Sequence, residues 1–104
     1  MALTKEFKST IMSRAKKDKK FCEAMLSEAV MELLTGDVNT GKSILRDYIN
    51  ATLTFEVLSK FMEKSPKSIM RMLSANGNPT SKSLFMIFHV IQKVKKLHFK
   101  IVVH

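Results

Sequence analysis

Residues 54–73 read TFEVLSKFMEKSPKSIMRML, and this stretch decides the fold. Its apolar residues recur at helical spacing, among them Leu58, Met62, Ile69 and Met72. The Ser65-Pro66 pair interrupts the pattern and restarts it, because serine caps a helix and proline suits its first turn. The stretch therefore predicts two short helices, at 55–62 and 66–74, in a helix-turn-helix whose second helix can lie in the major groove of DNA.

The same helical period predicts further helices at 4–17, 19–35, 42–51 and 82–95. Asp18 is expected to cap the second helix, Gly36 to end it in a left-handed conformation, and Ser81 to cap the last one. We therefore expect one all-α domain over residues 1–104, a compact bundle of about six helices. Residues 1–52 supply the N-terminal helices and residues 53–95 the helix-turn-helix core.

The C-terminal residues 97–103 differ from the rest of the chain. Their alternating, β-branched sequence LHFKIVV predicts a short strand. Because a lone strand has no partner in a helical chain, we expect it to pair with a second copy and form a homodimer. A frayed tail, or a tail docked on its own core, is the alternative.

Charge is unevenly distributed along the chain, whose net charge is +9. Residues 1–52 carry nine basic and seven acidic side chains, whereas residues 53–104 carry nine basic and two acidic ones. After Glu63 there is no acidic residue. A polyanion such as double-stranded DNA is the expected partner, although a solvated basic surface that aids solubility would show the same bias.

Composition favours an intracellular protein. The single cysteine, Cys22, excludes an internal disulfide. No apolar run approaches the length of a membrane span, and the N-terminus lacks a signal-peptide pattern. These features predict a cytoplasmic protein without a membrane partner.

Helix geometry places Ile69, Met72 and Leu73 on the inner face of the second motif helix, and Lys67, Ser68, Arg71 and Ser74 on its outer face. Arg71 can donate two parallel hydrogen bonds to guanine, Lys67 can reach a guanine or a phosphate, and Ser68 can contact a base edge or a phosphate. Residues at helix starts and beside this helix are candidates for phosphate contacts. The expected DNA-binding residues are Thr54, Lys64, Ser65, Lys67, Ser68, Arg71, Asn76 and Lys82. For each of them the alternative is an ordinary solvated surface residue.

Residues 54–94 resemble the lambda-repressor-like helix-turn-helix fold, through the Leu58-Ser59 pair, Ile69, the Asn78-Pro79 turn and the apolar helix that follows. A wider stretch resembles bacterial regulators described as addiction-module antidote proteins. The matching segments are AVMELL at 29–34, Gly36-Asp37, LRDYINAT at 45–52, PKSIMRM at 66–72 and GNP at 77–79. This resemblance implies a dimeric repressor and, in some relatives, neutralisation of a partner toxin. Glu63 departs from the pattern, since a glycine is usual at that turn position, and we expect Glu63 to adopt the turn conformation at some cost.

Residues 36–43, GDVNTGKS, fit the phosphate-loop pattern in full. A phosphate loop follows a buried parallel strand, whereas the residues before Gly36 have a helical period. We therefore interpret the match as accidental: Gly36 ends a helix, Asn39 or Thr40 starts the next, and Lys42 lies on the surface. Its replacement by alanine would then leave both the fold and DNA binding intact.

Other chemistry is sparse, since the histidines and Cys22 show no zinc-ligand spacing. The sequence thus predicts no catalytic residues, metal or cofactor, and favours a DNA-binding regulator over two competing classes. These are an interaction module that masks a toxin and binds DNA only secondarily, and a nucleotide-binding enzyme.

Overall fold

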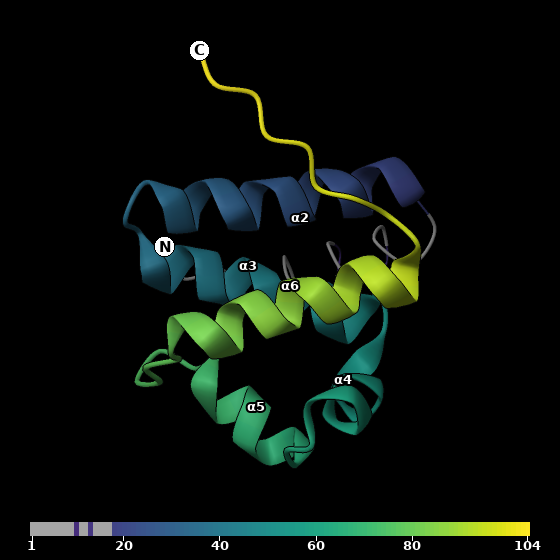
Figure 1. The fold of residues 1–104 in the computed structure, drawn as a ribbon, viewed down its shortest axis with the longest axis vertical. Helices are drawn as coiled ribbons and strands as arrows, with labels where there is room; N and C mark the ends of the chain where they lie inside the picture. Colours follow the sequence, from purple (N-terminus) through teal and green to yellow (C-terminus); the bar gives the residue numbers. More distant parts are fainter. Residues whose placement is uncertain (1–9, 11–12, 14–17) are drawn as a thin grey trace.

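Five helices form within the residues that the computed structural model describes, namely Thr10, Ser13 and residues 18–104 (Figure 1). They are α2 (Lys19–Leu34), α3 (Val38–Ala51), α4 (Thr54–Met62), α5 (Pro66–Met72) and α6 (Ser81–Lys95). The all-α prediction is confirmed for this part of the chain, with five helices rather than about six. The predicted helix at 4–17 lies outside the described residues, apart from Thr10 and Ser13.

Local capping explains where helix α2 begins and ends. The Asp18 carboxylate accepts a hydrogen bond from the Phe21 amide at 3.1 Å, which satisfies one of the free amides of the first turn. Gly36 follows the helix with a φ of 93°, a conformation that only glycine adopts without steric cost. The predicted start of this helix and the left-handed Gly36 after it are therefore confirmed, and the helix ends at Leu34, one residue before the predicted end.

Two other helix starts differ from the prediction. Helix α3 begins at Val38 and is capped by Asp37, whose carboxylate accepts from the Thr40 amide at 3.2 Å, so Asn39 and Thr40 lie inside the helix. Hydrogen bonds from the Thr40 side chain and then its amide lower the pKa of Asp37, so the cap is charged at neutral pH. Helix α6 is likewise capped by Thr80 rather than Ser81. In each case a residue earlier in the sequence than the predicted cap accepts the hydrogen bond from a free amide of the first turn.

Helices α2 and α3 form a hairpin, and α4, α5 and α6 complete the molecule around one hydrophobic core (Figure 1). Leu45, Ile49, Leu58, Ile69 and Ile87 are all fully buried in that core. They come from four different helices, and each stabilises the fold by about 1.5–3 kcal/mol relative to an exposed side chain. Helices α4 and α5 are therefore held by the same core as the hairpin of α2 and α3.

The turn between α4 and α5 contains Glu63 in a left-handed conformation, with φ 55° and ψ 37°. An L-residue with a Cβ adopts this conformation at a cost of about 1–2 kcal/mol. The expectation that Glu63 takes the turn conformation of the usual glycine is therefore confirmed.

The C-terminal strand predicted at 97–103 does not form within the described residues, where residues 97–104 have no regular structure. Leu97 and Phe99 dock on the core instead, and the Phe99 ring meets Phe88 edge-on at 5.5 Å between centroids. The Phe99 amide donates to the Gln92 side-chain oxygen at 3.1 Å. The alternating apolar residues Leu97 and Phe99 therefore pack against the core and helix α6 and do not form a strand. Beyond Phe99 the tail projects from the molecule (Figure 1).

Candidate nucleic-acid interface

One face of helix α5 packs against the hydrophobic core. Ile69 and Leu73 are fully buried and Met72 packs against the core, as predicted. Ser65 caps the helix, accepting from the Ser68 amide at 3.1 Å, and Pro66 occupies the first turn. Ser74, expected on the outer face, is half-buried, and its hydroxyl donates to the Arg71 carbonyl at 2.7 Å.

The opposite face of α5 presents cationic and small polar groups. Lys67 and Arg71 are exposed and Ser68 is partly exposed, and no acidic residue occupies the first turn. Arginine offers five donors in a planar fork, which matches a pair of acceptors on a guanine edge or a phosphate. The outer face of a short, projecting helix therefore carries donors suited to nucleic acid.

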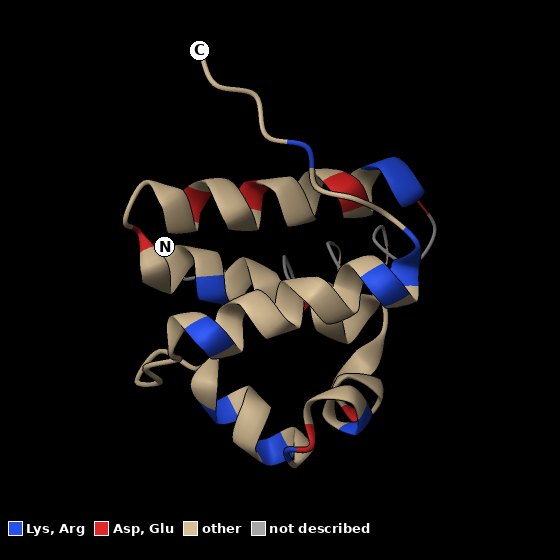
Figure 2. Ribbon diagram, viewed as in Figure 1, with Lys and Arg blue, Asp and Glu red and all other residues tan. Residues whose placement is uncertain are grey.

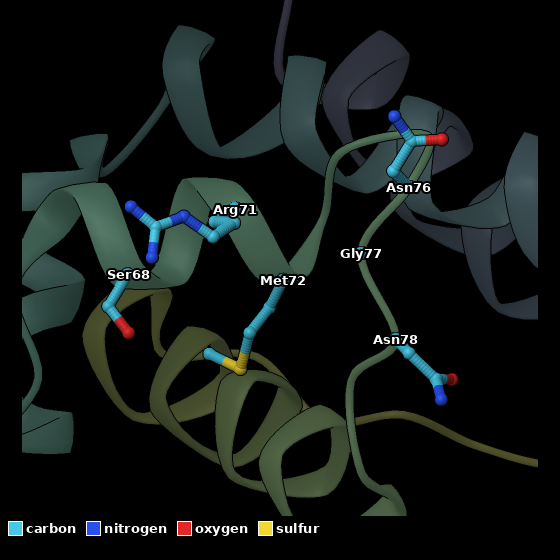
Figure 3. A pocket seen from close by; sticks show the side chains of 6 residues that line it. All are labelled: Ser68, Arg71, Met72, Asn76, Gly77 and Asn78. Atoms are coloured by element: carbon cyan, nitrogen blue, oxygen red, sulfur yellow. The ribbon is translucent and has the colours of Figure 1, made fainter.

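An open hollow of about 300 Å³ lies between α5 and the loop that follows it (Figure 3). Its lining residues are Ser68, Arg71, Met72, Asn76, Gly77 and Asn78. In Figure 3 the Ser68, Arg71 and Met72 side chains come from α5, while Asn76 and Asn78 project from the loop. The structure thus brings three of the predicted residues, Ser68, Arg71 and Asn76, to one site, and adds Asn78.

The other predicted residues surround α5 at different places. Lys64 and Ser65 are exposed in the turn before the helix, and Lys82 is exposed in the first turn of α6. Thr54 is exposed at the opposite end of α4 from the turn. A nine-residue helix is about 13 Å long, so Thr54 is separated from the turn by that distance.

Charge is distributed asymmetrically over the helices (Figure 2). Glu23, Glu28 and Glu32 lie on α2, whereas α5 and α6 carry only basic charged residues. Glu56 and Glu63 are the acidic residues of the α4 segment and its turn. A polyanion would therefore meet less repulsion along α5 and the start of α6 than along α2.

Lys42 was predicted to lie on the surface, and this prediction is wrong. Only 3% of its surface is exposed, and its ammonium group donates to the Ser74 carbonyl at 2.9 Å and the Gly77 carbonyl at 2.7 Å. Arg46, one turn further along α3, donates to the Leu73 carbonyl at 3.2 Å. The structure therefore reverses the expectation for alanine at position 42: Lys42→Ala is expected to destabilise the fold, because two carbonyls that accept from a buried cation would be left without this donor.

The residues that match the phosphate-loop pattern, 36–43, form the connection between α2 and α3 and the first turns of α3. Gly41 is buried inside α3, and its amide donates to the Asp37 carbonyl at 3.0 Å. Because that amide and the Lys42 ammonium group are already engaged, neither is available to cradle a phosphate as this motif requires.

The sequence contains a pattern that indicates burial of Lys42. Lys42 lies three residues before Leu45 and seven before Ile49, which places all three on one face of α3. That face is the core face, since Leu45 and Ile49 are fully buried. A cation at a core position indicates an acceptor supplied by a distant segment.

Among the described residues, no group of three or more His, Cys, Asp or Glu side chains is placed to hold a metal ion. None of the described helices is both long and apolar enough to cross a membrane. In comparisons with known proteins, no family model, curated protein or solved structure matches this chain.

Proposed function

We propose that this chain is a sequence-specific DNA-binding transcriptional regulator, acting as a cytoplasmic repressor of the antidote type. The observation that supports it best is helix α5: Ile69 and Leu73 fix its inner face, while Lys67, Ser68 and Arg71 are presented outward. A short helix held in this way can enter a major groove, which is wide enough for one helix.

Each candidate residue has a role in this proposal. Arg71 reads a guanine edge, and Lys67 and Ser68 contact a base edge or a phosphate. The remaining candidates contact phosphates and set the position of the protein on the duplex. These are Thr54, Lys64, Ser65, Asn76 and Lys82.

Arg71→Ala is expected to reduce discrimination between DNA sequences, because a bidentate contact to guanine contributes about 1–3 kcal/mol of specificity. Lys82→Ala is expected to weaken binding to all duplexes alike and to lower the salt slope by about one for each phosphate contact that is removed. The measurement compares the duplex selected by the wild type from a random pool with a scrambled duplex, at several salt concentrations. Lys20→Ala, which changes an exposed lysine of α2, is the matched charge control.

The outcomes separate the two roles. If Arg71→Ala weakens binding equally on both duplexes, Arg71 positions the protein and does not read bases. If it weakens binding to neither duplex, α5 is not the recognition helix and the proposal is wrong.

The proposal includes a homodimer, with one recognition helix for each half-site. It is supported by the end of the tail, where Ile101, Val102 and Val103 are 79%, 64% and 89% exposed. Extended β-branched segments expose unpaired amides and carbonyls, and two tails related by a two-fold axis can pair with each other.

Removal of residues 100–104 is expected to raise the dimer dissociation constant by at least about tenfold, which corresponds to about 1.4 kcal/mol. The truncation keeps Phe99 and its contact with Phe88, so the unfolding temperature of the protomer should change little. Sedimentation velocity over a range of concentrations measures both species. An unchanged dimer after truncation would place the interface elsewhere.

A second candidate function is masking of a toxin, with DNA binding secondary. The observation that favours it is the exposure of large apolar side chains, with Met31 at 55%, Leu34 at 72% and Phe85 at 72%. Exposed apolar side chains of this kind occur at protein-binding surfaces when they form a contiguous patch. If the product of the neighbouring reading frame binds this chain, and Leu34→Ser prevents binding while Arg71→Ala does not, this second function takes precedence.

The proposal includes no catalytic activity and no cofactor. This part of the proposal is supported by the hydrogen bonds that the Lys42 ammonium group and the Gly41 amide donate to main-chain carbonyls of the protein. A nucleotide titration tests it directly, because binding of ATP or GTP that Lys42→Met abolishes without unfolding the protein would contradict it.

A further inference from the structure

Among the residues that the structure describes, Lys42 is the buried charged side chain, and the proposed DNA contacts make no use of it. Its ammonium group donates to two main-chain carbonyls that are far away in sequence, those of Ser74 and Gly77. Both carbonyls belong to the segment that leaves helix α5. The charge therefore acts within the protein, where a partly buried hydrogen bond from a cation is stronger than one between neutral groups.

Arg46 repeats this arrangement one turn along α3. Residues four apart lie on the same face of a helix, so Lys42 and Arg46 point at α5 together. Arg46 donates to the carbonyl of Leu73, the residue that ends α5. The last carbonyls of a helix have no partner within the helix, and cations are favoured there by the helix dipole.

The short length of α5 makes these contacts important. It has seven residues, about two turns, and helices of that length are not stable without tertiary contacts. Its inner face is fixed by burial of Ile69 and Leu73. Hydrophobic burial is not directional, whereas a hydrogen bond has a preferred distance and angle. The Arg71 side chain, on the last turn, depends on how that end of the helix is held.

We infer that Lys42 and Arg46 are positioning residues for recognition, which clamp the C-terminal end of α5 and the loop 74–77 so that Arg71, Asn76 and Asn78 keep their arrangement around the hollow. The clamp works from the protein side and does not contact the nucleic acid. This inference rests on the proposed function, since it assigns how the same site is held in place.

The test uses Lys42→Met, which keeps an unbranched stem and removes the donor, and Arg46→Met, which is milder because Arg46 is only half-buried. Lys20→Met, which changes an exposed lysine of α2, is the matched control for removal of one positive charge. Arg46→Lys keeps a donor and should restore part of the effect. Each variant is first shown to be folded at the assay temperature by circular dichroism.

The expected result is a fall of about tenfold in the ratio of affinities for the selected and scrambled duplexes, the amount carried by one bidentate base contact. Lys20→Met should leave that ratio unchanged. A purely structural role lowers the unfolding temperature but does not change the ratio for the folded protein. If both methionine variants destabilise the fold and leave the ratio unchanged, the inference is overturned.

Hydrogen exchange supplies a readout that is independent of DNA. The amides of Leu73, Ser74 and Gly77 donate to carbonyls at the end of α5 and in its loop, and they should exchange faster in Lys42→Met than in Lys20→Met, relative to core amides. If the wild type binds no DNA, the proposed function fails, and the clamp is judged on exchange alone. Faster exchange at these three amides then supports it, and equal exchange contradicts it.

Discussion

Binding to duplex DNA is expected to weaken by about 10³–10⁵ when salt rises from about 50 to 200 mM. The physical reason is release of counterions from phosphates that the protein neutralises. Lys64, Lys67, Arg71 and Lys82 are exposed on and around α5, and no acidic residue follows Glu63 in the sequence. A dimer presents this set twice, which is consistent with about six to ten phosphate contacts.

Fluorescence anisotropy on one labelled duplex, at five or more salt concentrations, gives the slope of log affinity against log salt. Lys64→Ala and Lys82→Ala should each lower that slope by about one for every phosphate that is no longer neutralised. Lys20→Ala, remote from α5 on helix α2, should leave it close to the wild-type value. A slope near zero for the wild type would remove the electrostatic basis of the proposal, whatever the affinity.

Gly77→Ala is expected to destabilise the protein by about 3 kcal/mol, since insertion of a carbon into a packed site costs this much when its neighbours cannot move. A Cβ at this position would overlap the Arg71 carbonyl oxygen and would lie 2.5 Å from that of Met72. Both are main-chain atoms at the end of α5, so no side-chain rotation relieves the clash. Either the loop or the helix end must shift.

Thermal and urea unfolding measure this effect, and the unfolding temperature should fall by more than about 10 °C. Gly36→Ala is the matched control, because that site has a positive φ but nothing within 4 Å of an added Cβ. It should cost only the conformational strain, about 1 kcal/mol. Equal destabilisation by the two substitutions would show that the close approach at Gly77 is relieved by movement of the loop.

Sequence reasoning located the helices well because helices are local. The apolar period, Asp18 before α2 and Ser65-Pro66 before α5 act over one or two turns, and all of this can be seen in a short window. The wrong predictions of two helix caps also concerned neighbouring residues. Asp37 and Thr80 accept hydrogen bonds from first-turn amides, whereas later residues had been predicted to do so. For the site, the outward placement of Lys67 and Arg71 followed from helix geometry alone.

The sequence by itself determined the all-α class and the two short helices α4 and α5 with the turn at Glu63 between them, because spacing and capping fix these within a few residues. Only the tertiary structure decided the roles of Lys42 and Phe99. A lysine is buried only where acceptors are available to it, and those of Lys42 lie more than thirty residues away, at Ser74 and Gly77. An alternating segment forms a strand only where another strand edge is available for pairing. In this structure Phe99 packs against Phe88 and donates to Gln92, both of helix α6.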